Sequence, residues 1–167
     1  MYDKITQKDI ARMEKEIEHR KLVVRKEALE DVKEARAHGD LSENFEYKAA
    51  KQFKNQNESR IRYLERMIKT AQIIPEDSNA DEVGLNDKVN IYYPDDNEEE
   101  TVKIVTTVRS NSLKGRISID SPIGKALLHH KVSERITVRV NDTITYDVII
   151  KNIEKLEDNG EDELRKY

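Results

Sequence analysis

The chain has 167 residues, 36% of them hydrophobic and 38% charged, which allows one domain or two small ones but disfavours one large core. It contains no cysteine, which excludes disulfides, thiolate metal sites and a cysteine nucleophile. Residues 1–75 carry 17 Lys/Arg against 14 Asp/Glu, and residues 76–167 carry 13 against 20. A formal charge of +3 on residues 1–75 is too small for a protein that binds duplex DNA by itself. We therefore expect the protein to contact nucleic acid only within a larger assembly.

The sequence shows no sign of export or of membrane insertion. The first residues contain no apolar signal core, and no window approaches the ~18 consecutive apolar residues of a membrane span. We therefore expect a soluble, cytoplasmic protein without membrane contact, and we expect it to be a monomer.

Two long helical patterns joined by a short turn fill residues 1–75. Thr6 and Asp9 have the spacing of a capping box, which predicts a helix start. Until Gly39 the apolar residues recur at helical spacing, namely Ile10, Met13, Ile17, Val24, Ala28, Val32 and Ala35. A second apolar stripe precedes Pro75 and contains Phe45, Ala49, Phe53, Ile61, Leu64, Ile68 and Ala71. The short connection predicts an antiparallel coiled-coil hairpin.

After an acidic linker at residues 76–84, the helical spacing of apolar residues gives way to β-branched runs. Ser121 as cap and Pro122 at the first helical position predict one short helix. Runs of β-branched residues predict five strands, at 88–93, 101–108, 116–119, 135–140 and 143–150. The predicted fold class is α+β, with a small antiparallel sheet domain over residues 85–153 and an acidic tail over 154–167 whose structure is left open.

The turn of the hairpin carries two acids, Asp40 and Glu43, three residues apart. This spacing is common in capping boxes, where both acids simply stabilise a helix start. Alternatively, two carboxylates on one face suit Mg²⁺, which accepts one or two protein carboxylates plus waters and substrate phosphates. Arg36 and Lys51 are the basic residues nearest the turn and are candidates for contacting a phosphate backbone. The histidines are not at metal-ligand spacing.

Two segments resemble a known family. Residues 35–47, Ala-Arg-Ala-His-Gly-Asp-Leu-Ser-Glu-Asn-Phe-Glu-Tyr, together with Ala-Ala-Lys at 49–51, resemble the hairpin tip of the Gre family of bacterial transcript-cleavage factors, and the GreA type more than the GreB type. Residues 120–127, Asp-Ser-Pro-Ile-Gly-Lys-Ala-Leu, resemble the C-terminal signature of that family. Phe45 departs from the family pattern, in which this position is usually small.

The resemblance implies a transcription elongation factor whose coiled coil enters the secondary channel of bacterial RNA polymerase. An FKBP-like C-terminal domain would dock at the channel rim through Asp120, Ser121 and Pro122. The catalytic acids of the family fall on Asp40 and Glu43, where they help the polymerase hold its second Mg²⁺ and activate water, so that a backtracked RNA 3′ end is cut. The protein would then be no enzyme itself, and Mg²⁺ would be shared with the polymerase rather than bound tightly by the free protein.

Three other functions stay open. A regulator could occupy the same channel without promoting cleavage, although the two intact acids argue against this. A prolyl isomerase would also have an FKBP-like fold, but the second half offers only four tyrosines for the aromatic pocket that such an enzyme needs. A coiled-coil adaptor would leave the acid pair incidental.

Overall fold

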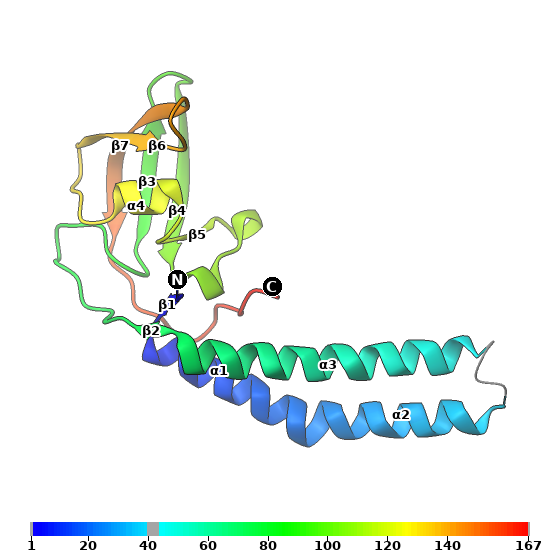
Figure 1. Cartoon of the computed structure of the whole chain (residues 1–167). Helices are drawn as coiled ribbons and strands as arrows, with labels where there is room; N and C mark the ends of the chain where they lie inside the picture. Colours follow the sequence, from blue (N-terminus) through cyan, green and yellow to red (C-terminus); the bar gives the residue numbers. More distant parts are fainter. Residues whose placement is uncertain (1, 40–43, 167) are drawn as a thin grey trace. The chain divides into compact units, whose positions relative to one another are not determined.

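The computed structural model describes residues 2–39 and 44–166. Two compact units make up the chain: residues 10–71 form a helical hairpin, and residues 3–9 together with those from 72 onwards form a sheet unit (Figure 1). The predicted α+β fold, with a helical hairpin followed by a sheet domain that carries one short helix, is confirmed.

The hairpin has a first arm built of three consecutive helical segments and a second arm of one. The first arm comprises α1 (Gln7–His19), a π-helical turn (Arg20–Val24) and α2 (Arg25–Ala37). The second arm is α3 (Phe45–Thr70), which lies beside α2 (Figure 1). As predicted, α1 starts with a capping box, in which Thr6 Oγ1 accepts from Asp9 N and Asp9 Oδ2 accepts from Thr6 N, both at 3.1 Å.

The apolar seam follows the predicted stripe in α2 but only partly in α3. Its buried apolar residues are Ala28, Val32 and Ala35 on α2 and Ile61, Leu64 and Met67 on α3. The prediction was wrong for three seam residues, because Phe45, Ala49 and Phe53 are exposed, Phe45 at 79% and Phe53 at 49%. The buried stripe of α3 instead passes through the polar residues Asn57 and Arg60, which a search for apolar periodicity ignores.

Polar contacts across the seam coincide with the π-helical turn. Asn57 exchanges two hydrogen bonds with Arg20, accepting from its Nη1 at 2.9 Å and donating to its main-chain oxygen at 3.3 Å. Glu16 accepts from both Arg20 Nε and Arg60 Nε at 2.8 Å. Burial raises the pKa of Glu16, but the hydrogen bonds from Arg60 and Arg20 outweigh it and the pKa is lowered. In the π-helical turn, the main-chain oxygen of Arg20 thus accepts a hydrogen bond from the side chain of Asn57 on the opposite arm.

The sheet unit contains a five-stranded sheet in the order β5, β4, β3, β7, β6. Its strands are β3 (Lys88–Tyr93), β4 (Glu98–Val105), β5 (Arg116–Ser118), β6 (Arg135–Arg139) and β7 (Thr145–Glu154). All neighbours are antiparallel except β4 and β5, which pair in parallel because two 3₁₀ turns, Thr107–Arg109 and Ser112–Lys114, return the chain between them. A two-residue parallel pair, β1 (Lys4–Ile5) with β2 (Gln72–Ile73), completes the strands of the described residues.

One short helix, α4 (Pro122–Leu127), packs against the sheet (Figure 1). The apolar core lies beneath it and is formed mainly by strand residues, including Val89, Ile91, Ile104, Val138, Val148 and Ile150, together with Leu127 of the helix. Alternating buried and exposed positions along β6 show why this strand could be recognised from its sequence.

A fully buried guanidinium joins three distant segments of the sheet unit. Arg109 Nε lies 2.8 Å from Asp9 Oδ1, and Arg109 Nη1 lies 2.9 Å from Asn86 Oδ1 and 3.1 Å from Asp162 Oδ2. Arg109 and Asp9 both have zero exposure. A charge removed from water in this way is tolerated only with close partners of opposite charge. The start of α1, the first 3₁₀ turn and the acidic tail therefore meet at Arg109.

We predict that Arg109→Met lowers the free energy of unfolding by about 3–5 kcal/mol, because it removes the guanidinium that pairs with the buried carboxylate of Asp9 and one of the cations that pair with Asp162. Urea unfolding of the full chain measures the loss. Arg135→Met is the control, since Arg135 pairs with Asp147 at 2.9 Å on the surface of the same unit. The control should change stability far less, and equal losses in the two variants would contradict a special role for the buried pair.

Candidate functional site

The two acids predicted to be catalytic, Asp40 and Glu43, lie outside the described residues. The structure does describe both helix ends that flank them. Helix α2 ends at Ala37, and the main-chain N–H of His38 bonds to the oxygen of Ala35 at 3.2 Å. Gly39 follows with φ of +120°, a conformation that side chains rarely adopt, so glycine is required to leave the helix in this direction.

Asn44 is the residue that starts the second arm. Its Oδ1 accepts from Tyr47 N at 3.0 Å, which is the N-cap interaction of α3. Its Nδ2 donates to the main-chain oxygen of Ala35 at 2.7 Å, at the end of α2. One side-chain amide therefore caps the second helix and ties it to the first.

The cap at Asn44 tests whether Asp40 and Glu43 form the capping box of α3. A capping box made by Asp40 and Glu43 would place Asp40 at the N-cap of the following helix. The N-cap of α3 is Asn44, four residues further along the sequence, so α3 does not begin with the capping box that the spacing predicted as one alternative.

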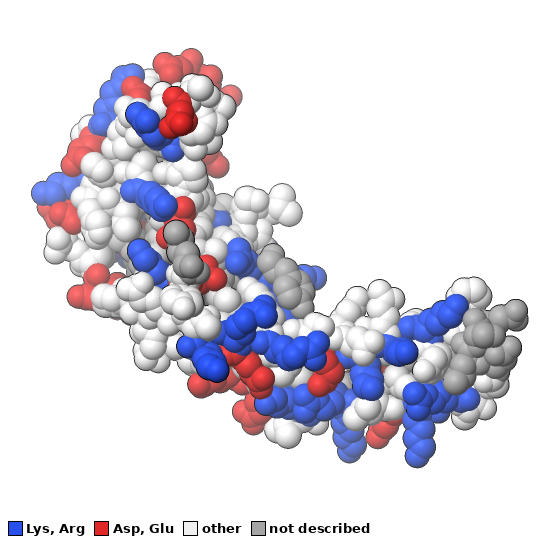
Figure 2. All heavy atoms as spheres, viewed as in Figure 1, with Lys and Arg blue, Asp and Glu red and all other residues white. Residues whose placement is uncertain are grey.

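Aromatic and cationic side chains lie together on the first turns of α3 and the last turn of α2. The Arg36 guanidinium lies 5.5 Å from the ring centroid of Tyr47, and Lys48 Nζ lies 5.7 Å from that of Phe45. A hydrogen bond from Arg36 lowers the pKa of Tyr47. Lys51 is exposed on the next turn. Lysine and arginine side chains occupy much of the visible face of the hairpin (Figure 2).

The predicted docking segment lies at the start of α4 in the sheet unit. Asp120 and Pro122 are exposed, whereas Ser121 is half-buried. Ser121 Oγ accepts from Gly124 N at 3.0 Å and donates to Ser118 O at 2.7 Å, so it is the N-cap predicted from the sequence. Asp120 Oδ2 accepts from Thr107 Oγ1 at 3.1 Å. Asp120 and Pro122 are accessible to a partner, and Ser121 fixes the backbone that presents them.

Gly124 is required for this arrangement. A Cβ at this position would lie 2.0 Å from the main-chain oxygen of Ser118, so any other residue would push the helix away from β5. This close approach explains why a glycine occurs inside a helix, where it costs about 1 kcal/mol relative to alanine.

The described residues offer little support for the other activities considered. No cluster of three metal-binding side chains occurs within residues 2–39 and 44–166. Tyr93 and Tyr146 pack against the core with ring centroids 6.0 Å apart, and Tyr93 Oη donates to Glu100 at 2.6 Å. Burial, together with the Glu100 carboxylate, raises the pKa of Tyr93. These rings serve the core, whereas an isomerase pocket would need them facing a substrate.

We predict that Asn44→Ala lowers the stability of the hairpin by about 1 kcal/mol or more, because both the cap and the link to Ala35 are lost. Asn44→Asp is the matched variant, since a carboxylate retains the cap but cannot donate to the Ala35 oxygen. Thermal unfolding followed by circular dichroism should rank wild type above Asn44→Asp and Asn44→Ala last. If both variants unfold at the wild-type temperature, Asn44 does not hold the arms together.

Comparisons with known proteins agree with the family resemblance of residues 35–51 and 120–127. The family model "Transcription elongation factor, N-terminal" matches residues 4–73, and the model "Transcription elongation factor, GreA/GreB, C-term" matches residues 77–155. No described helix is long and apolar enough to cross a membrane. Among solved structures, Gfh1 of Thermus thermophilus is 27% identical, over 93% of this chain and 100% of that one, but its TM-score of 0.42 supports no structural argument.

Two relatives named "Transcription elongation factor GreA" match most of the chain. The protein of Geobacillus kaustophilus is 46% identical over 81% of this chain and 86% of its own length. The protein of Bacillus velezensis is 45% identical over 77% of this chain and 82% of its own length. Matches of this extent to both family models and to full-length relatives show that the chain belongs to the GreA/GreB family of transcription elongation factors.

Proposed function

We propose that this protein stimulates the cleavage of backtracked RNA by bacterial RNA polymerase, with its hairpin tip inserted through the secondary channel. The observation that supports the proposal is the cap at Asn44, because α3 begins with this residue and the spacing of Asp40 and Glu43 is therefore not the capping box of α3. The polymerase supplies the active site, and the protein supplies two carboxylates.

The donor set of the turn fits Mg²⁺ held jointly with another protein. Asp40 and Glu43 would offer two carboxylates, the number that Mg²⁺ commonly takes from a protein, and the polymerase and waters would supply the remaining ligands. When bound, Mg²⁺ neutralises charge on the attacking and leaving oxygens of a phosphodiester. The two carboxylates would also accept hydrogen bonds from the attacking water and orient it toward the phosphate.

Basic residues near the turn would hold the RNA. The Arg36 guanidinium is positioned by Tyr47, which restricts the conformations available to it, while Lys51 is exposed one turn further along α3. Both would contact phosphates of the RNA 3′ end, where cations give affinity without sequence selectivity. The sheet unit would dock at the channel rim through the exposed residues Asp120 and Pro122, and the protein would act as a cytoplasmic monomer.

We predict that Asp40→Asn and Glu43→Gln each lower the rate of transcript cleavage by about two orders of magnitude at saturating protein, because a neutral amide is a poorer Mg²⁺ ligand than a carboxylate. Affinity for the polymerase and the thermal midpoint should stay near the wild-type values. The assay is RNA cleavage in stalled elongation complexes. Asp31→Asn, an exposed acid on α2, is the control and should cleave normally.

Two outcomes would contradict the mechanism. Near-normal cleavage with both variants would show that Asp40 and Glu43 take no part in the reaction. RNA cleavage or tight Mg²⁺ binding by the free protein would show that it contains a complete metal site, whereas the mechanism requires one shared with the polymerase. If the wild-type protein competes for the polymerase but leaves stalled RNA intact, it is the channel-binding regulator without cleavage activity.

We predict that Asp120→Asn weakens competition for the polymerase by about tenfold without changing the thermal midpoint, because Asp120 is exposed and an asparagine oxygen still accepts from Thr107. Ser121→Ala should weaken binding and also lower the thermal midpoint, since it removes the cap of α4. The control is Asp142→Asn, which makes the same charge change in an exposed loop. If Asp120→Asn and Asp142→Asn weaken polymerase binding equally, the effect comes from net charge and not from a contact of Asp120.

A further inference from the structure

Phe45, the first residue of α3, presents its aromatic ring to solvent. It is 79% exposed, and Ala49, one turn further along the same face of the helix, is exposed as well. Neither residue belongs to the buried seam between α2 and α3. A single exposed apolar side chain is common on protein surfaces, so the ring alone indicates no ligand, and its surroundings decide what it can bind.

Three cations lie near Phe45 and the neighbouring ring of Tyr47. Lys48 Nζ lies 5.7 Å from the ring centroid of Phe45, and the Arg36 guanidinium lies 5.5 Å from that of Tyr47. Both distances are those of cation–π contacts, which hold the charged groups beside the rings. Lys51 is exposed and follows Tyr47 by four residues, so it lies on the same face of α3 as that ring.

Carboxylates of the described residues do not neutralise these cations. Within residues 2–39 and 44–166, neither Arg36, Lys48 nor Lys51 forms an ion pair with an aspartate or glutamate. The acid of the first turn of α3, Glu46, lies 3.1 Å from His38 Nδ1 instead. The positive charge beside the two rings is therefore available to an anion.

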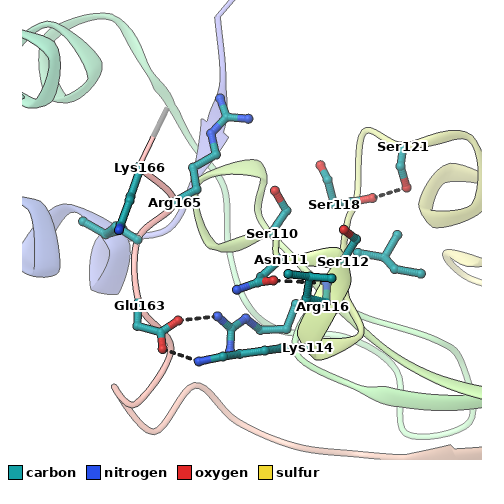
Figure 3. A pocket seen from close by; sticks show the side chains of 13 residues that line it. Ser110, Asn111, Ser112, Lys114, Arg116, Ser118, Ser121, Glu163, Arg165 and Lys166 are labelled. Carbon is teal, nitrogen blue, oxygen red and sulfur yellow. Dashed lines mark hydrogen bonds and ion pairs between the residues drawn. The ribbon is translucent and has the colours of Figure 1, made fainter.

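The cations of the sheet unit are in the opposite situation. Lys114 and Arg116 line a pocket of about 880 Å³ (Figure 3). Glu163 Oε2 lies 2.7 Å from Arg116 Nη2, and Glu163 Oε1 pairs with Lys114 Nζ. The hydrogen bonds from Lys114 and Arg116 lower the pKa of Glu163 to about 2, so this carboxylate is ionised at neutral pH. The charge of the pocket is thus already engaged by the protein itself.

An exposed aromatic face with available cations beside it matches a nucleotide, which carries a flat base next to a phosphate. Proteins hold single-stranded nucleic acid by stacking bases on aromatic side chains while cations follow the backbone. We infer that Phe45 stacks on an unpaired base of single-stranded RNA and that Lys48 contacts the adjacent phosphate. The choice of the backtracked 3′ segment as that RNA rests on the proposed function. The Gre pattern usually has a small residue at position 45, so the contact adds to the mechanism of that pattern.

The first test uses the free protein and needs no polymerase. The chain contains no tryptophan, so Phe45→Trp introduces a single fluorescent reporter into the full-length protein. Single-stranded oligoadenylate RNA at low salt should quench this fluorescence by stacking, whereas a ribose-phosphate strand of equal length without bases should not. Leu22→Trp, at a position 67% exposed on the π-helical turn, is the control and should respond equally to both strands. Equal or absent quenching of Phe45→Trp by the two strands would overturn the inference.

The second test measures transcript cleavage in stalled elongation complexes at saturating protein. Phe45→Ala should lower the rate about tenfold, because the base loses its stacking partner. Phe45→Tyr keeps the ring and should retain most of the rate, while Phe45→Leu keeps apolar bulk without a π face and should resemble Phe45→Ala. Polymerase affinity and the thermal midpoint should stay near the wild-type values. A Phe45→Leu variant that cleaves like wild type would contradict stacking.

Elongation complexes whose unpaired RNA 3′ nucleotides lack bases complete a double-mutant cycle. On this RNA, wild type and Phe45→Ala should cleave at the same rate, because no base is present to stack. A Phe45→Ala loss of unchanged size would overturn the inference, and weaker polymerase binding with normal cleavage at saturation would show that the ring contacts protein instead. Failure of the cleavage mechanism itself would appear as uncleaved RNA with the wild-type protein, and quenching of Phe45→Trp would still decide whether residue 45 stacks on RNA.

Discussion

The ion pair between Arg109 and Asp9 is the constraint on which the sheet unit depends. Both side chains are fully buried, and each would be costly to bury alone. The carboxylate that neutralises Arg109 also closes the capping box of α1, since Asp9 accepts from Thr6 N and from Thr106 Oγ1 at 2.7 Å. Charge neutralisation, helix initiation and anchoring of a 3₁₀ turn therefore share one carboxylate, and none of the three can be altered without the others.

At the far end of the hairpin, short-range contacts of single residues shape the two helix ends. Gly39 lets the chain leave α2, and Asn44 caps α3 and bonds to the end of α2. A turn between two such helix ends can carry a specific reaction on a general scaffold.

Local signals made much of this fold predictable. The capping box of Thr6 and Asp9, the proline after Ser121 and the β-branched runs all act within a few residues, and each marked an element that the structure contains. The cap at Asn44 was missed because Asp40, Ser42 and Asn44 are all good N-cap residues within five positions. The exposure of Phe45, the burial of Arg109 and the parallel pairing of β5 depend on residues far away in sequence, which periodicity does not register. The catalytic assignment of Asp40 and Glu43 came from family resemblance and stays a prediction.

The π-helical turn at Arg20–Val24 has a geometric consequence for the hairpin. A π turn amounts to one residue more than an α-helix would use, and each residue of an α-helix advances the azimuth by about 100°. If this extra residue were deleted, α1 and α2 would merge into one regular helix, but every side chain beyond the deletion would rotate by about a quarter turn relative to those before it. The direction in which the side chains of α2 face, relative to those of α1, is therefore set by a single residue in the middle of the arm.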